Sequence, residues 1–88
     1  MKTIRIAIGA KLKKRRTELG ISQAQLAGAL GVSVAQIQKY ELGVNAVPAC
    51  VLYFISNVLD THIGDFFVDL PVKTAPIDLS PPPSNTIQ

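Results

Sequence analysis

Amide and ammonium side chains gather on one face of residues 33–41, which read SVAQIQKYE. If this stretch is helical with Ile37 directed inward, its outward face carries two amides, one ammonium group and one small methyl side chain. These groups belong to Gln36, Gln38, Lys39 and Ala35. An amide can form two hydrogen bonds to adenine, a lysine suits guanine or phosphate, and an alanine allows contact with the methyl group of thymine. The face therefore suits the edges of DNA bases. The alternative is an ordinary solvent-exposed surface, since many helices expose glutamine and lysine.

The rest of the sequence offers no second constellation for chemistry. A metal site needs more ligands than one histidine, His62, and one cysteine, Cys50, can provide. We interpret Cys50 as a small packing residue, His62 as part of a turn, and Asp60 and Asp65 as helix-end residues. Neither a glycine-rich phosphate loop nor a nucleophile with a neighbouring base is present. We therefore expect no enzyme activity, no cofactor, no metal and no small-molecule ligand.

Positive charge is concentrated at the N-terminal end of the chain. There are 9 basic and 6 acidic residues, which give a net charge of +3. Seven of the bases precede the first acid, Glu18, whereas after Tyr40 a single base, Lys73, stands against five acids. A basic end of this kind favours a polyanionic partner, and the alternative is a solvated helix face.

Length and composition limit the class of protein. The 88 residues suffice for one compact domain, and a hydrophobic share of 48% favours some apolar surface that a partner chain covers. The longest apolar stretch, Ala46 to Ile55, has ten residues and a proline, whereas a membrane span needs about 20 residues. No signal peptide is visible, and a single cysteine excludes an internal disulfide. We therefore expect a cytoplasmic protein without a membrane segment.

Capping patterns predict two short helices around the polar face. Ser22 and Gln25 form an S-x-x-Q capping box, and Ser33 and Gln36 repeat it eleven residues later. Hydrophobic staples accompany both boxes, formed by Ile21 with Leu26 and by Val32 with Ile37. Because only a turn led by Gly31 separates the two helices, they meet at a tight corner and cross at a steep angle.

Three further helices and a tail complete the predicted fold. Apolar spacing and proline positions predict helices over about 3–19, 48–59 and 63–67. From Pro71 onward, five prolines occur in eighteen residues, which is typical of a chain without a core of its own. The prediction is an all-α, compact bundle of four or five helices over residues 1–70, followed by a flexible, disordered, proline-rich tail over residues 71–88.

Two charged residues fall on inward helix faces. Arg16 lies on the same side of the first helix as Leu12 and Leu19, and Glu41 lies on the Ile37 side of the third helix. Val34 and Tyr40 also fall near that inward side. A charge that points into a small core needs a partner, so we expect Arg16 and Glu41 to form a buried ion pair.

The segment from Ser22 to Glu41, SQAQLAGALGVSVAQIQKYE, resembles the helix-turn-helix of phage repressors and their bacterial relatives, the Cro/C1 or XRE family. The resemblance extends from about Ile8 to Phe67 and includes LKKRRTELGISQ and LDTHIGDFF. It implies a bundle of the lambda-repressor-like DNA-binding type, with the motif over residues 22–41. It also implies a nucleoid-associated transcriptional regulator that recognises double-stranded DNA by sequence.

The resemblance implies roles for individual residues. Val34, Ala35, Gln36 and Lys39 match positions that reach base edges in the major groove. Gln23, Ser33 and Asn45 match positions that contact the DNA backbone. In the same family pattern, Arg16 and Glu41 match a structural ion pair between the first and third helices.

The sequence departs from the family pattern just after the third helix. Relatives usually carry arginine or lysine there, whereas this chain has Leu42, Val44, Ala46 and Val47. Several phosphate contacts are then missing, which lowers affinity at physiological salt. The basic residues of the first helix can compensate in part.

The predicted helix over residues 48–59 has a second apolar face beside its core stripe, and a helix that is apolar nearly all round must be buried. We expect a homodimer contact made by Val51, Phe54, Val58, Phe66 and Phe67; the alternative is a tail that folds back over them. Such a dimer would act as a repressor on a palindrome-like operator. The alternative function is a protein-interaction module, such as an antitoxin-like partner, with weak DNA binding.

Overall fold

The computed structural model describes residues 2–71 and 75–81. All regular secondary structure in these residues is helical, which confirms the predicted all-α class. The elements are α1 (Lys2–Glu18), α2 (Gln23–Leu30), α3 (Val34–Leu42), α4 (Ala49–Val58) and a 3-10 helix, η1 (Ile63–Phe67).

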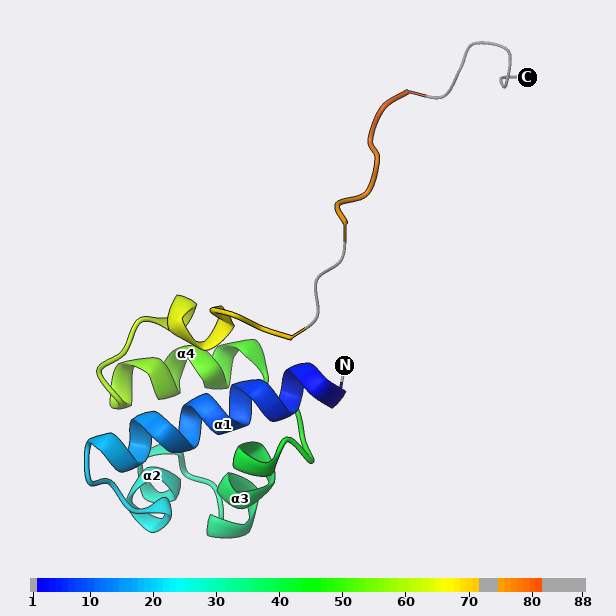
Figure 1. Ribbon diagram of the computed structural model, residues 1–88. Helices are drawn as coiled ribbons and strands as arrows, with labels where there is room; N and C mark the ends of the chain where they lie inside the picture. The colour runs from blue at the N-terminus through cyan, green and yellow to red at the C-terminus, as the bar shows by residue number, and fades with distance from the viewer. Residues whose placement is uncertain (1, 72–74, 82–88) are drawn as a thin grey trace.

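Helix α1 runs through the middle of the bundle (Figure 1). It packs against α3 on one side and against η1 on the other, while α2 contacts both α3 and α4. The core lies where these elements meet, and its fully buried side chains are Leu12, Leu26, Ile37, Ile55 and Leu59. Burial of one such side chain contributes about 1.5–3 kcal/mol, so each of the four α-helices adds to the stability of one shared core.

A glycine brings the backbones of α1 and α3 together. A Cβ atom built on Gly9 would overlap the carbonyl oxygen of Tyr40 and lie 2.6 Å from that of Glu41. At the next contact, Gly43 has a φ of 73° and would place a Cβ atom 2.5 Å from the Cα of Ile6. Glycine at these two positions therefore lets α1 approach the second half of α3 closely.

The helix starts follow the capping patterns, with one difference. At α2, the backbone amide of Gln25 donates to the Ser22 hydroxyl at 3.0 Å, and the backbone amide of Ser22 donates to Oε1 of the Gln25 side chain at 2.7 Å. At α3, the backbone amide of Gln36 donates to the Ser33 hydroxyl at 3.1 Å, but the Gln36 side chain does not bond to the backbone amide of Ser33. The first capping box is complete, whereas the second is half formed, with the serine acceptor alone capping the start of α3.

Two apolar residues expected on inward faces are exposed. Leu19 lies in the turn beyond the end of α1 and is 40% exposed, and Val34, the first residue of α3, is 39% exposed. Both sit at helix ends, where neighbouring elements do not cover them. Residues 75–81 form neither helix nor strand and are all exposed, and they lead away from the bundle (Figure 1). The rest of the predicted tail, residues 72–74 and 82–88, lies outside the described residues.

Candidate nucleic-acid interface

The outward face of α3 is formed by the side chains that remain exposed once its core side is packed. Ile37, Tyr40 and Glu41 are buried, and Gln36 is half-buried. The exposed residues are Val34, Ala35, Gln38, Lys39 and Leu42. These positions recur at intervals of one, three and four, so they form one continuous strip along the helix. The strip carries one ammonium group and one exposed amide among small and apolar side chains.

The orientation of α3 relative to α1 is fixed by a buried ion pair. The Arg16 Nε donates to Glu41 Oε2 at 2.6 Å, and its Nη2 donates to Oε1 at 3.1 Å. The side chains are 9% and 2% exposed, so the structure brings this predicted pair together inside the bundle. The remaining terminal nitrogen of Arg16, Nη1, donates to the carbonyl of Ile21 at 2.7 Å. This two-point contact resists rotation of α3 about its own axis.

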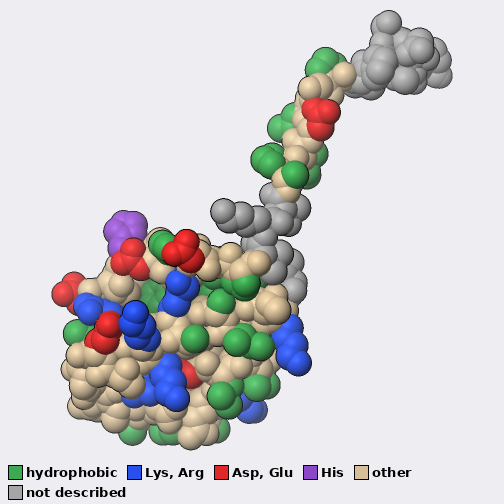
Figure 2. Space-filling model, in the orientation of Figure 1, with side chains coloured by type: hydrophobic (Ala, Val, Ile, Leu, Met, Phe, Trp, Pro, Cys, Tyr) green, Lys and Arg blue, Asp and Glu red, His purple; other side chains and the backbone are tan. Residues whose placement is uncertain are grey.

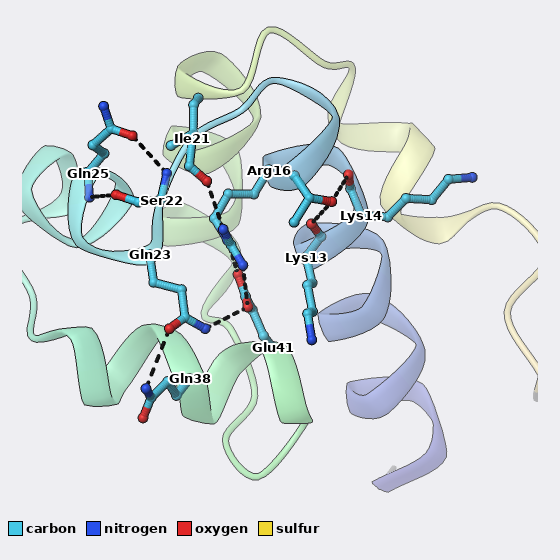
Figure 3. A network of polar contacts seen from close by, with 10 residues as sticks. Lys13, Lys14, Arg16, Ile21, Ser22, Gln23, Gln25, Gln38 and Glu41 are labelled. Carbon is cyan, nitrogen blue, oxygen red and sulfur yellow. Dashed lines mark hydrogen bonds and ion pairs between the residues drawn. The ribbon is translucent and has the colours of Figure 1, made fainter.

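A chain of hydrogen bonds leads from this pair to the surface (Figure 3). The Gln23 Nε2 donates to Glu41 Oε1 at 3.0 Å, and the Gln38 Nε2 donates to Gln23 Oε1 at 3.4 Å. The carboxylate of Glu41 can only accept, so it fixes which end of the Gln23 amide faces it. The Gln38 nitrogen is thereby turned toward Gln23, and its oxygen is left as the outward group.

Arg5 and Arg15 of α1 bond to backbone carbonyls just beyond the ends of other helices. Arg5 Nε donates to the carbonyl of Gly43 at 3.2 Å, beyond the end of α3. Arg15 donates from Nε to the carbonyl of Leu59 at 3.0 Å and from Nη2 to that of Asp60 at 2.9 Å, beyond the end of α4. Cations at helix C-termini satisfy the last carbonyls and oppose the helix dipole. The charge available for a polyanion on α1 therefore comes mainly from its lysines.

The loop after α3 is apolar and exposed. Leu42 and Val44 are 67% and 60% exposed, and hydrophobic side chains gather on this side of the molecule (Figure 2). Asn45 is also exposed, and its backbone amide donates to the Lys39 carbonyl at 3.3 Å. That bond holds Asn45 against the C-terminal end of α3, beside the outward strip.

The apolar face of α4 is only partly available for a partner. Phe54 and Phe67 are 49% and 48% exposed, while Val51 and Val58 are half-buried. Phe66 is 2% exposed and belongs to the core, so its predicted place in a dimer contact is wrong. Within η1, neighbouring residues point in different directions, and packing turns Phe66 inward while leaving its neighbour outside.

A shallow groove of about 250 Å³ adjoins this face. It is lined by Leu30, Val32, Cys50, Val51 and Phe54. Tyr53 and Val68 extend the exposed apolar surface nearby, at 59% and 51% exposed.

The single histidine has a structural role. The His62 Nδ1 accepts from the Gly64 amide at 3.2 Å and so caps η1. In the part of the chain that the structure describes, no three residues of the His, Cys, Asp and Glu types lie close enough to hold a metal ion. No helix among residues 2–71 and 75–81 is long and apolar enough to cross a membrane. A hydrogen bond from the Ser80 backbone amide holds the pKa of Asp78 below its ordinary value, far along the chain from α3.

Two short helices that meet at a glycine corner, with the second presenting an exposed strip that includes Gln38 and Lys39, define a helix-turn-helix DNA-binding protein. A family model described as helix-turn-helix matches residues 12–66 of this chain. The chain belongs to the helix-turn-helix family of Cro/C1 (XRE) type, whose members are DNA-binding transcriptional regulators and not enzymes.

Curated relatives are named as transcriptional regulators. An uncharacterized HTH-type transcriptional regulator of Sinorhizobium medicae is 46% identical over 68 residues, which cover 77% of this chain and 49% of the relative. An uncharacterized transcriptional regulator in the ATPase CF(0) region of Rhodospirillum rubrum is 46% identical over 63 residues, 72% of this chain and 58% of the relative. The chain thus spans about half the length of these curated relatives.

A solved structure has the same fold. The crystal structure of the clp gene regulator ClgR from Corynebacterium glutamicum superposes with a TM-score of 0.70 at 28% identity. The match covers 74% of this chain and 84% of the other.

Proposed function

We propose that this chain is a sequence-specific repressor that inserts α3 into the major groove of its operator. The observation that carries the proposal is the exposed strip on α3, which is held in place by the buried pair of Arg16 and Glu41. A reading helix must be rigid, because small rotations move its side chains out of hydrogen-bond reach of the base edges. Repression then follows from occupation of the promoter.

Individual contacts are assigned by the match to the family pattern, and the exposure of Val34, Ala35 and Lys39, with Gln36 half-buried beside them, supports the assignment. Val34, Ala35, Gln36 and Lys39 read base edges, with Lys39 directed to guanine and Ala35 close to a thymine methyl group. Ser33, Asn45 and the backbone amide of Gln23 contact the DNA backbone. This assignment for Gln23 is supported by its place in the first turn of α2, where amides lack a partner within the helix.

A homodimer supplies the affinity that one copy lacks. The apolar loop at Leu42 and Val44 offers no cations for phosphate, so a single domain binds weakly. The exposed rings of Phe54 and Phe67, beside the half-buried Val51 and Val58, support a contact with a second copy. Two copies would place their α3 helices in successive major grooves, about 34–36 Å apart, on a palindrome-like operator.

Selection of bound duplexes from a random pool tests the proposal directly. We expect enrichment of an inverted repeat whose half-sites lie one helical turn apart. The double variant Gln36→Ala with Lys39→Ala is expected to lose that preference while its thermal melt stays unchanged, because both residues lie outside the core. Absence of sequence preference in the unchanged chain at low salt would overturn the proposal.

A second candidate, a protein-interaction module with weak DNA binding, is favoured by the exposed Leu42 and Val44 beside α3. The two candidates differ in the partner that the chain binds and in whether it selects DNA by sequence. A repressor forms a self-dimer that shifts operator DNA, whereas an interaction module forms a stable complex with one other protein and leaves random duplexes unselected.

A further inference from the structure

A notch at the junction of α1, α2 and α3 lies beside the proposed reading face. It encloses about 150 Å³ and is lined by Lys13, Gln23, Gln38, Glu41 and Leu42. Its residues come from all three helices, and Leu42 and Gln38 also belong to the exposed strip of α3. A DNA backbone that flanks α3 in the major groove would pass this notch.

The helical repeat explains why Lys13 faces α3. Gly9, Lys13 and Arg16 follow one another at spacings of four and three, which place them on one stripe of α1. Gly9 touches the backbone of α3, and Arg16 pairs with Glu41 of α3. Lys13 lies between these two contacts on the same stripe, but it is exposed.

The next residue, Lys14, faces elsewhere. It lines a different cavity together with Asp60, His62 and Asp65, on the side of α4 and η1. The two lysine side chains leave α1 in different directions, with Lys13 extending toward the level of α3 (Figure 3). Adjacent lysines of equal charge therefore serve as a matched pair for an experiment.

The charges around the notch leave a net cation. Glu41 is neutralised by two hydrogen bonds from Arg16, at 2.6 and 3.1 Å, and its side chain is only 2% exposed. The Gln23 and Gln38 amides are uncharged. In the part of the chain that the structure describes, Lys13 forms no salt bridge. Its ammonium group is therefore available to an anion.

The hydrogen bonds also decide which group can hold that anion. The Gln23 nitrogen donates to Glu41 and its oxygen accepts from Gln38, so the side chain of Gln23 is engaged in the network. The side-chain oxygen of Gln23 is an acceptor, so it repels a phosphate oxygen. The network uses neither the backbone amide of Gln23 nor the ammonium group of Lys13, so these two donors are the ones that we assign to the anion.

We propose that Lys13 completes a binding site for one phosphate of the DNA backbone, in place of the cations missing from the loop after α3. The Gln23 side chain is a positioning residue in this site, which holds Gln38 while its backbone amide joins Lys13. The proposal rests on the proposed DNA binding and adds one contact to it.

The salt dependence of binding tests the proposal. Lys13→Gln and Lys14→Gln variants of the full chain are titrated with the selected operator duplex between 50 and 300 mM salt. One lost phosphate contact lowers the slope of log K against log salt by about 0.9, which corresponds to about eightfold weaker binding at 0.1 M salt. We expect this change for Lys13→Gln and an unchanged slope for Lys14→Gln, with equal thermal melts for both variants.

Each outcome has one meaning. Equal slopes and affinities for the two variants would overturn the phosphate site while leaving DNA binding by α3 in place. Equal losses in both variants would also overturn it, because they would indicate a diffuse field of α1. An unchanged chain that binds no duplex at 50 mM salt would overturn the proposed function, and the site with it.

Discussion

Replacement of Glu41 by glutamine probes the buried ion pair with the smallest change in shape. The side chain keeps its length and one acceptor oxygen, but it loses its charge. Arg16, whose side chain is 9% exposed, then stays buried with its charge uncompensated. Removing one partner of a buried pair costs about 3–5 kcal/mol, because the remaining charge has been taken out of water without a counter-charge.

This cost is large for a domain of this size. At roughly 0.05–0.15 kcal/mol per residue, about 70 folded residues are stabilised by roughly 4–10 kcal/mol. A loss of about 3 kcal/mol lowers the melting temperature by about 12–24 °C, since each kcal/mol corresponds to about 4–8 °C in a domain of this length. We therefore expect Glu41→Gln to be partly unfolded at 37 °C.

Urea unfolding followed by circular dichroism measures this loss. The matched control is the double variant Arg16→Met with Glu41→Leu, which removes both charges and fills the space with apolar groups. Such replacements are often neutral or stabilising, so the double variant is expected to unfold at higher urea than Glu41→Gln. A loss below about 1 kcal/mol for the single variant, or a double variant less stable than the single one, would refute the assignment of a buried, obligatory pair.

Three further predictions concern packing, assembly and DNA affinity. Gly9→Ala is expected to destabilise the fold by about 1–3 kcal/mol, because its Cβ atom meets the backbone of α3. The control Gly28→Ala, whose Cβ atom meets nothing within 4 Å, is expected to stabilise the fold by about 0.5–1 kcal/mol. Similar changes in stability for the two variants in calorimetry would contradict the close approach of α1 and α3. Phe54→Ser is expected to weaken the proposed dimer in sedimentation experiments without loss of fold, whereas Phe66→Ala is expected to lower the free energy of unfolding by about 3–5 kcal/mol. A Phe54→Ser variant that unfolds, or one that dimerises as strongly as the unchanged chain, would place the interface elsewhere. Leu42→Arg, at a side chain 67% exposed, is expected to strengthen operator binding and steepen its salt dependence by about 0.9, and an unchanged slope would show that DNA does not reach this position.

Local patterns in the sequence predict the helix-turn-helix well. The complete capping box of Ser22 and Gln25 spans four residues, and the left-handed Gly31 follows directly after α2, so both depend on short-range chemistry alone. The pairing of Arg16 with Glu41 is also accessible, because two helical wheels each leave one charge facing inward.

Contacts between distant segments are harder to predict. Arg5 and Arg15 bond to carbonyls 38 to 45 residues away, and sequence spacing alone does not distinguish them from lysines on a solvated face. The role of Gly9 depends on how closely two helices approach, which no local signal encodes. Phe66 and Phe67 are adjacent and chemically identical, and only the packing of η1 against the bundle decides that the first is buried and the second exposed.

The hydrogen-bond network that begins at Arg16 separates the surface of α3 into two classes of position. Gln38 is tied to the interior through Gln23, so its replacement disturbs that network. The side chains of Val34, Ala35 and Lys39 form no hydrogen bond within the described residues, and they can change without a cost to the core. Descendants of this protein could therefore acquire new operators through these three positions while inheriting the same scaffold.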